Sequence, residues 1–398
     1  MDQLDILQIS LFEGDQINGE SYDDLRVTLE QLHGAVVWGT DWTAETIVNQ
    51  IEKGQIDIRP KFQRREAWDD RRKSAFIESV IAGLPIPPII LAEKKDKKGT
   101  YLVIDGKQRL ISLRRFFSEA DDEEFPALRL KGIDLLAKLN NKTYKEICDD
   151  AVLNDYISQV ENQPIRTIVI KNWPNEEFLY NVFLRLNTGS LPLSTQELRQ
   201  ALHPGPFLDF CDDFSMDSQP IKQILNLKGP DYRMRDIELV VRFFAFKFFI
   251  VDYTGNLKWF FDETVEKLNQ LWAQDESNII QHAESLNRAI SLCIDIFGEK
   301  PFRKWKDGSF DKRFNRAIYD IMVYYFSNTS IYEATQSKKD RVKDAFIELC
   351  STDAVFLSSF EFSTKNIIPT QYRFRVWGNK LSSILDIPIS VPEISNER

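Results

Sequence analysis

The hydrophobic pattern of the chain changes near residue 205. Before that point, short apolar runs typical of β-strands alternate with helical segments, and after it the 3.6-residue spacing of α-helices dominates. The loop His203-Pro204-Gly205-Pro206 interrupts both patterns, and 398 residues are enough for two domains. We therefore predict an α+β fold: an N-terminal extension in residues 1–40, an α+β domain in residues 41–204, and an all-helical domain in residues 205–398.

The composition narrows the classes of protein to which the chain can belong. Hydrophobic residues make up 43% of it, so a sizeable core can form and wholesale disorder is excluded. The 51 Lys and Arg against 61 Asp and Glu give a net charge of −10, which argues against a protein that coats nucleic acid. The four cysteines are widely spaced and there are only three histidines, so neither a zinc ribbon nor a disulfide framework is predicted.

No membrane segment or export signal is predicted. Residues 1–16 lack a basic segment that leads into an apolar core. The most apolar long stretch, 239–251, contains Arg242 and Lys247 and is shorter than the roughly 20 apolar residues that a bilayer requires. We interpret that stretch as a buried helix and expect a cytoplasmic protein with no membrane partner.

The first domain is predicted to alternate strands and helices. The run 101–104 is apolar throughout, as in a strand at the centre of a sheet. The expected strands are 56–58, 89–92, 101–104 and 166–171, and the expected helices are 43–54, 69–83, 108–117 and 176–186. In the second domain the expected helices are 237–251, 257–272, 279–297, 314–326 and 341–349.

The segment Tyr101 to Leu110 combines features that suit an anion. A buried strand ends in Asp105 and Gly106, and a helix begins immediately. Glycine lets a ligand approach the backbone, the first N–H groups of a helix are unpaired, and Lys107 and Arg109 add charge that attracts phosphate. Asp105 could hold a magnesium ion or orient a water molecule. The alternative that these residues leave open is that Asp105 only caps the helix and pairs with Arg109.

A second segment, residues 59–73, is basic in an acidic chain. It holds seven basic and three acidic residues, a local charge of +4 against −10 overall. A basic patch on an acidic background indicates a recognition site. The alternative, a solvated helix face, explains residues 71–73 well. It explains Gln63 and Arg64 less well, because they lie in the loop between a strand and a helix.

A third segment, residues 183–198, places a polar loop between two helices. Asn187 and Thr188 in this loop could contact a base, a ribose or a phosphate, and a plain helix–helix turn is an equally good explanation. Ser194 and Glu197 have the spacing of a capping box, in which each side chain bonds the backbone N–H of the other residue. The next helix is therefore expected to begin at Ser194.

The order of these motifs resembles that of a known family. F-Q-R-x-x-x-W is followed by I-P-P-I-x-L, by V-I-D-G-x-Q-R-L and by F-x-R-L-N-T-G-x-x-x-L-S-x-x-E-L-R. This series is similar to the N-terminal domain family of GmrSD-type restriction systems, a branch of the ParB/sulfiredoxin-like superfamily. The resemblance covers residues 40–205 and continues weakly through residues 233–236. It implies a ParB/sulfiredoxin-like small mixed sheet with helices.

The resemblance also implies a site for a nucleoside triphosphate with Mg²⁺. The family signature D-G-x-Q-R is associated with nucleotide binding and hydrolysis. The catalytic residues implied are Asp105, which is also the metal ligand, and Arg109. The nucleotide-binding residues implied are Gln63, Arg64, Gly106, Lys107, Gln108, Asn187 and Thr188.

The sequence departs from the family pattern in two ways. Lys107 stands where D-G-Q-Q-R has a glutamine, which could strengthen phosphate binding or change the nucleotide, so the motif as it stands supports binding more directly than hydrolysis. Full-length relatives often carry a C-terminal HNH-type nuclease domain, which needs a histidine as general base. After residue 205 the chain has only His282, in a helical context without a neighbouring His or Asn, so we expect no HNH nuclease.

A basic stretch with interleaved aromatic residues also lies in the second domain. Residues 301–316 hold six Lys or Arg and two Asp, a local charge of +4. Such a mixture can bind a single strand or a DNA backbone, although aromatic residues are more often part of the core. The candidate nucleic-acid contacts are Arg303, Lys304, Lys306, Lys312 and Arg313.

Three functions follow from these observations. The first is a protein of a bacterial anti-phage or restriction-type system that binds a nucleoside triphosphate and hydrolyses it. The second is a ParB-like DNA-binding or DNA-processing protein that the nucleotide regulates. The third is a non-catalytic specificity or regulatory subunit. A separate nuclease or effector subunit, DNA and a second copy of the chain are the partners left open.

Overall fold

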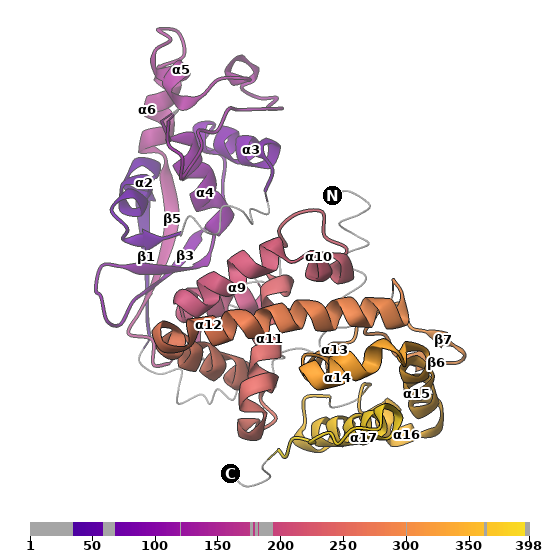
Figure 1. The fold of residues 1–398 in the computed structure, drawn as a ribbon. Coiled ribbons are helices and arrows are strands. Elements are labelled where there is room, and N and C mark those ends of the chain that lie inside the picture. The colour runs from indigo at the N-terminus through magenta and orange to yellow at the C-terminus, as the bar shows by residue number, and fades with distance from the viewer. Residues whose placement is uncertain are drawn as a thin grey trace. The chain divides into compact units, whose positions relative to one another are not determined.

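The computed structural model describes residues 35–58, 68–119, 121–175, 178–179, 182, 194–299, 301–361 and 364–394. Within these residues the chain forms two compact units, which meet in sequence between Leu202 and His203. We call the described residues up to Leu202 the first unit and those from His203 onward the helical unit. Figure 1 shows a mixed sheet with helices in the former and packed helices in the latter.

The first unit is built on a five-stranded sheet with the order β1-β5-β3-β4-β2. The strands are β1 (Val36–Thr43), β2 (Ile56–Asp57), β3 (Ile89–Glu93), β4 (Tyr101–Asp105) and β5 (Pro164–Lys171). The pairs β1–β5 and β3–β4 are antiparallel, whereas β3–β5 and β2–β4 are parallel. The apolar strand β4 lies inside the sheet, as its sequence predicts.

Hydrophobic side chains cover both faces of this sheet. On one face Leu91 and Val103 share a core with Ile77 of α3 and Leu110 of α4. On the other face Ile104 packs in a second cluster, which includes Leu198 of α8. The helices of the unit are α2 (Ala44–Glu52), α3 (Asp70–Ile81), α4 (Lys107–Phe116), η4 (Ala137–Leu139), α5 (Tyr144–Cys148), α6 (Asp155–Asn162) and α8 (Thr195–Leu202).

Two helix starts in the first unit follow directly from capping residues. The side chain of Asp69 accepts a hydrogen bond from the backbone N–H of Arg72 at 2.8 Å and so begins α3. At α8 the N–H of Ser194 donates to Glu197 Oε2 at 2.7 Å, and the N–H of Glu197 donates to Ser194 Oγ at 3.1 Å. The predicted capping box is therefore confirmed.

The helical unit is formed by packed helices and one short hairpin. Its elements are α9 (Pro206–Asp217), α10 (Gln219–Leu225), α11 (Arg235–Phe249), η5 (Ile250–Asp252), α12 (Leu257–Phe297), β6 (Trp305–Lys306), β7 (Ser309–Phe310), α13 (Arg316–Phe326), α14 (Thr329–Gln336), α15 (Lys339–Thr352), α16 (Ala354–Ser358) and α17 (Ile367–Leu385). The predicted α+β class, with a helical second part, is thus confirmed. Among the described helices, none combines the length and the apolarity that crossing a membrane would require.

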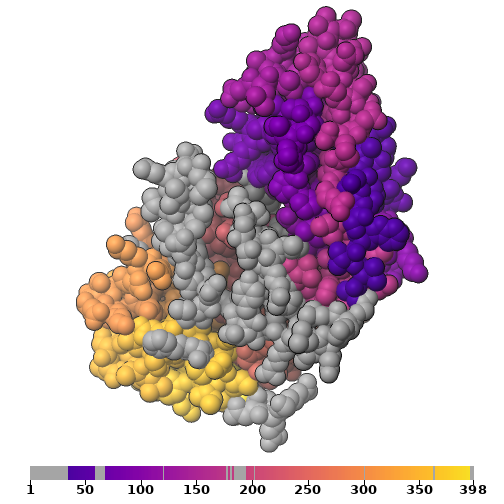
Figure 2. Space-filling view, turned by 180° about the vertical axis from the view of Figure 1, so that it is seen from behind, coloured from indigo at the N-terminus to yellow at the C-terminus, as the bar shows by residue number. Residues whose placement is uncertain are grey.

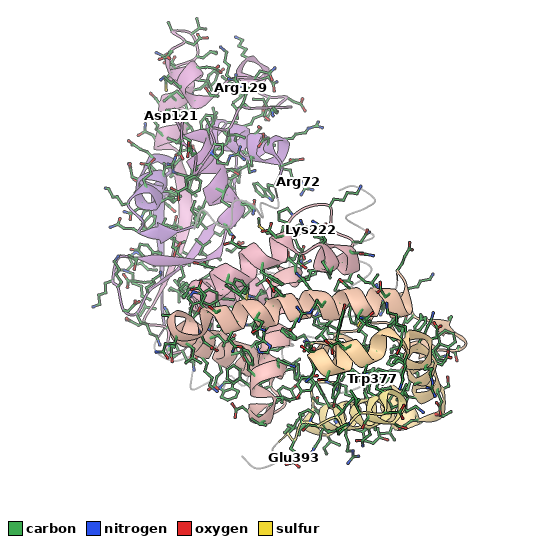
Figure 3. The ribbon with its side chains drawn as sticks, in the orientation of Figure 1. Arg72, Asp121, Arg129, Lys222, Trp377 and Glu393 are labelled. Atoms are coloured by element: carbon green, nitrogen blue, oxygen red, sulfur yellow. The ribbon has the colours of Figure 1, made fainter. Side chains whose placement is uncertain are left out.

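Aromatic rings and charged pairs fill the core of the helical unit. Trp377 of α17 is fully buried and packs edge-on against Phe326 of α13 and Phe346 of α15 (Figure 3). Arg242 of α11, which interrupts the apolar stretch that we interpreted as a buried helix, is itself buried and paired with Asp320 of α13. The interruption in that stretch is therefore an internal ion pair.

Two sequence expectations about elements were incomplete. No strand was expected before residue 56, yet β1 pairs with β5 from Val36–Lys171 to Thr43–Pro164, and Figure 2 shows the indigo and pink segments of the first unit side by side. Two helices were expected over 257–297, but α12 is a single helix of 41 residues. The polar residues 273–278 that suggested a break contain no glycine or proline, so the helix continues through them.

Candidate functional site

The end of β4 and the start of α4 are joined by one residue, Gly106. It caps α4 in the left-handed region, with φ 99° and ψ 11°, and no side chain caps the helix. A Cβ atom at this position would lie 3.2 Å from Ile89 Cγ1 and 3.1 Å from Arg109 Nη2. Both the backbone angle and the tight surroundings require glycine here. No side chain caps the first N–H groups of α4, and these groups can therefore donate hydrogen bonds to an anion.

Arg109 is held beside Gly106 by two acceptors. Its Nη2 donates to Asp105 Oδ2 at 2.9 Å and to the carbonyl of Pro88 at 3.2 Å. The side chain is only 11% exposed, and its Nε is buried without a hydrogen-bond partner. A buried guanidinium that keeps an unused N–H is costly unless a ligand or water completes it. Arg242 and Arg373 in the helical unit also keep a buried nitrogen without a partner, so such an atom does not by itself indicate a ligand. The Nε of Arg109 differs because it lies 3.3 Å from the position of a Cβ added at Gly106, beside the helix start that no side chain caps.

Asp105 pairs with Arg109, as one of the sequence alternatives predicted, but it does not cap α4. Its Oδ2 pairs with Arg109, and its side chain is 30% exposed. Its other carboxylate oxygen makes no hydrogen bond to the described residues. Among those residues, no group of three His, Cys, Asp or Glu side chains could hold a metal ion. Mg²⁺ at Asp105 would therefore be bound as Mg²⁺ often is, by one carboxylate completed with waters and phosphate oxygens.

Gln108 connects this site to α3. Its Oε1 accepts a hydrogen bond from the backbone N–H of Trp68 at 3.2 Å. Its carbonyl accepts from Ser112 Oγ one turn later at 2.6 Å. Trp68 immediately precedes Asp69, the cap of α3, so the start of α3 lies next to the start of α4.

The structure brings together only some of the residues that the sequence predicted. Asp105, Gly106, Gln108 and Arg109 form one group, and Lys107 is the first residue of α4. The remaining predicted nucleotide residues, Gln63, Arg64, Asn187 and Thr188, lie outside the described residues.

One participant was missed by the sequence analysis. The carbonyl of Pro88, in the turn before β3, accepts from Arg109. It reaches the site because Ile90 of β3 pairs with Asp105 of β4. The signal available in the sequence was the I-P-P-I motif, which contains Pro88 and which we used only as part of the motif series.

The basic stretch 301–316 is largely engaged within the helical unit. Lys304 and Lys306 both donate to Glu361 Oε1, at 2.9 and 3.0 Å. Phe302 and Phe314 are buried, and the guanidinium of Arg303 lies 5.7 Å from the ring of Phe314. Of the five predicted nucleic-acid contacts, Lys312 and Arg313 are exposed, and Lys306 is 51% exposed although it pairs with Glu361.

Glu361 has an electrostatic signature that reflects this engagement. Burial alone would raise the pKa of its carboxyl group. The hydrogen bonds from Lys304 and Lys306 outweigh burial and hold that pKa below its ordinary value. The two lysines therefore stabilise the hairpin β6–β7 against the end of α16, a role that needs no nucleic acid.

A comparison with protein families finds a match for the first unit. Residues 44–204 match the model of the N-terminal domain of the GmrSD restriction endonuclease. No curated protein and no solved structure gives a significant match. The match spans the whole strand–loop–helix site, together with the turn at Pro88 and the start of α3. The similarity to the GmrSD N-terminal family that the ordered motifs predicted is therefore confirmed over residues 44–204.

Proposed function

We propose that the first unit binds a nucleoside triphosphate at Gly106 and the N-terminus of α4, and hydrolyses it slowly with Mg²⁺, as part of a bacterial anti-phage or restriction-type system. The family of residues 44–204 supports a component of a restriction-type system. The observation that carries the nucleotide proposal is the buried Arg109 with an unpartnered Nε beside a glycine-capped helix start. Both groups offer N–H donors in the same place, which is what phosphate oxygens require.

Each residue of the group has a distinct role in this proposal. The N–H groups of the first turn of α4, Lys107 and Arg109 hold phosphate oxygens. Mg²⁺, which would supply charge neutralisation, is held by Asp105 with waters and phosphate. Arg109 is kept in place by the Pro88 carbonyl and by Asp105. The remaining contacts come from the family motifs that include Gln63, Arg64, Asn187 and Thr188.

The helical unit is proposed to transmit the nucleotide state to a separate nuclease or effector subunit. This step depends on the nucleotide site and is therefore tested after it. A partner that binds the full chain differently with and without nucleotide would support it, because a ligand shifts an equilibrium only through a difference in affinity.

Thermal-shift and calorimetric titration of the full chain with each NTP, with and without Mg²⁺, test the proposal. A ligand that binds only the folded chain raises its melting temperature. Arg109→Ala and Asp105→Ala should abolish this shift and any NTP turnover. Arg129→Ala is the matched control, because Arg129 pairs with Glu146 on the surface of the same unit, at 46% exposure (Figure 3). Wild-type protein that neither binds nor hydrolyses any NTP with Mg²⁺ present would contradict the proposal.

A further inference from the structure

The side chain of Gln108 has a fixed orientation. Its Oε1 accepts a hydrogen bond from the backbone N–H of Trp68 at 3.2 Å. A backbone N–H can only donate, so the amide oxygen of Gln108 must face Trp68 and its Nε2 must face elsewhere. The amide oxygen is therefore engaged within the protein, across 40 positions of sequence.

The contact anchors the entry of the chain into α3. Asp69, the next residue, caps α3 through the N–H of Arg72 at 2.8 Å. The Trp68 ring packs edge-on against Phe76 on the same helix, with 6.0 Å between ring centroids. Gln108 thus ties the first turn of α4 to a segment already fixed on α3. Without the Gln108 acceptor, the N–H of Trp68 would lose its partner.

A direct contact between this oxygen and a phosphate is chemically unfavourable. Phosphate oxygens and an amide oxygen are both acceptors, so they repel unless a proton or a metal lies between them. Only Nε2 could donate to the ligand. The structural use of the side chain, by contrast, already satisfies its oxygen.

We propose that Gln108 is a positioning residue, which sets the start of α3 against the phosphate-binding end of α4 through Trp68. This inference rests on the proposed nucleotide function. It assigns the glutamine of the D-G-K-Q-R segment to holding two elements together, with the ligand contacts left to Arg109, Lys107 and the backbone. The position of α3 then influences affinity although Gln108 itself does not grip the phosphates.

The experiment follows the amide of Trp68 directly. The chain has eight tryptophans, so selective ¹⁵N-tryptophan labelling gives a countable set of backbone signals, and Trp68→Phe identifies the one from Trp68. Gln108→Met removes the acceptor at similar size, whereas Gln108→Glu keeps an acceptor and removes the donor. Gln159→Met, on an exposed position of α6, is the matched control.

In nucleotide-free protein, Gln108→Met should speed hydrogen exchange of the Trp68 amide by about tenfold, the effect of losing one hydrogen bond. Gln108→Glu and Gln159→Met should leave it within about twofold. For the triphosphate, Gln108→Met should weaken binding more than Gln108→Glu does, although the glutamate adds a negative charge. A ligand contact through Nε2 gives the opposite order, because glutamate cannot donate and repels phosphate.

Three results would overturn the inference alone: unchanged Trp68 exchange in Gln108→Met, faster exchange with unchanged nucleotide affinity, or weaker binding by Gln108→Glu than by Gln108→Met. Wild-type protein that binds no triphosphate would overturn the proposed function, and this inference with it. The exchange rates of the nucleotide-free protein separate these cases, since they do not depend on the ligand.

Discussion

Two of the Asp–Arg pairs among the described residues differ in what surrounds them. In the helical unit, Arg242 grips both carboxylate oxygens of Asp320, through Nε and through Nη2 at 2.7 Å, with side chains 2% and 0% exposed. In the first unit, Arg109 contacts only Oδ2 of Asp105, and the carboxylate is 30% exposed. The first arrangement uses both carboxylate oxygens for structure, and the second uses only one oxygen of Asp105. Each arginine keeps one buried nitrogen without a hydrogen-bond partner, Nη1 in Arg242 and Nε in Arg109, so the pairs differ in the carboxylate and in its exposure. Residue type alone therefore does not distinguish a core ion pair from a pair proposed to bind a ligand.

Burial accounts for much of this difference. Desolvation raises the pKa of Asp320, and the charge and hydrogen bonds of Arg242 oppose that rise without cancelling it. A neighbouring arginine, Arg373, is also buried, and desolvation lowers its pKa to about 10. Burying such charged groups costs free energy, and the attraction between opposite charges offsets part of that cost. The pair in the first unit carries no comparable cost and can exchange its partners for a ligand.

The largest expected effect comes from removing one partner of the buried pair. Arg242→Met removes both hydrogen bonds that Asp320 accepts from Arg242 and leaves the buried carboxyl without its paired guanidinium, so the free energy of unfolding should fall by about 3–5 kcal/mol. The matched change Arg109→Met should cost only about 1 kcal/mol, as for a partly exposed pair, while abolishing nucleotide binding. Urea unfolding of the two variants measures both values.

The control for this comparison is the double variant Arg242→Met with Asp320→Leu. It removes both charges and should recover most of the lost stability, because an apolar pair of similar volume replaces a buried ion pair well. Equal costs for Arg242→Met and Arg109→Met would show that burial does not separate the two pairs.

The next largest effect is expected from substitution of Gly106, and Gly99 in the same unit is the reference position. Gly99 also has a positive φ, 76°, but an added Cβ there meets nothing within 4 Å. Gly99→Ala should therefore cost about 1 kcal/mol for backbone strain alone. Gly106→Ala adds contacts near 3.1–3.3 Å with Arg109 and Ile89, so it should destabilise more and also weaken NTP binding. Thermal unfolding and NTP titration of the two variants check this, and equal behaviour would remove the special role of Gly106.

The sequence predicted some elements of the first unit better than others. The strand–loop–helix at 101–116 was predictable because an apolar run, a glycine and a helical period follow one another within one segment. Strand β1 was not predictable, because Val37 and Trp38 are exposed, at 66% and 58%, and the strand lacks the alternation of a half-buried strand. Its partner β5 lies more than a hundred residues away, and that pairing has no local signal.

The site also contains contacts that only the fold creates. The Pro88 carbonyl reaches Arg109 because β3 and β4 are paired, and Trp68 reaches Gln108 because α3 and α4 lie together. The two contacts join residues that lie 21 and 40 positions apart in the sequence, and neither separation corresponds to a local pattern of a helix or a strand. The motif order indicated that these segments belong together, and the structure supplies the atoms that join them.

Lys107 is the first residue of α4. Positive charge at the start of a helix opposes the helix dipole and favours a bound anion. Lys107→Gln restores the residue of the family motif and should weaken triphosphate binding by about tenfold, the loss of one charged contact. The same variant should raise the turnover number if lysine limits hydrolysis. Affinity and turnover measured together separate the two roles, and unchanged affinity would show that Lys107 does not contact phosphate.

The smallest expected effect lies in the helical unit, at Glu361. Its pKa is lowered in the folded chain by Lys304 and Lys306, so its contribution to stability is present above the pKa of the unfolded carboxyl, about 4.3. That contribution is lost as the pH falls through the lower pKa of the folded state. Glu361→Gln should therefore be slightly less stable than wild type at pH 7. The free energies of unfolding of the two proteins should converge as the pH falls to about 3. Urea midpoints across that range measure the convergence. A difference in stability that persists at low pH would show that Glu361 acts through its shape and hydrogen bonds. Its charge, and the attraction of that charge to Lys304 and Lys306, would then not contribute to stability.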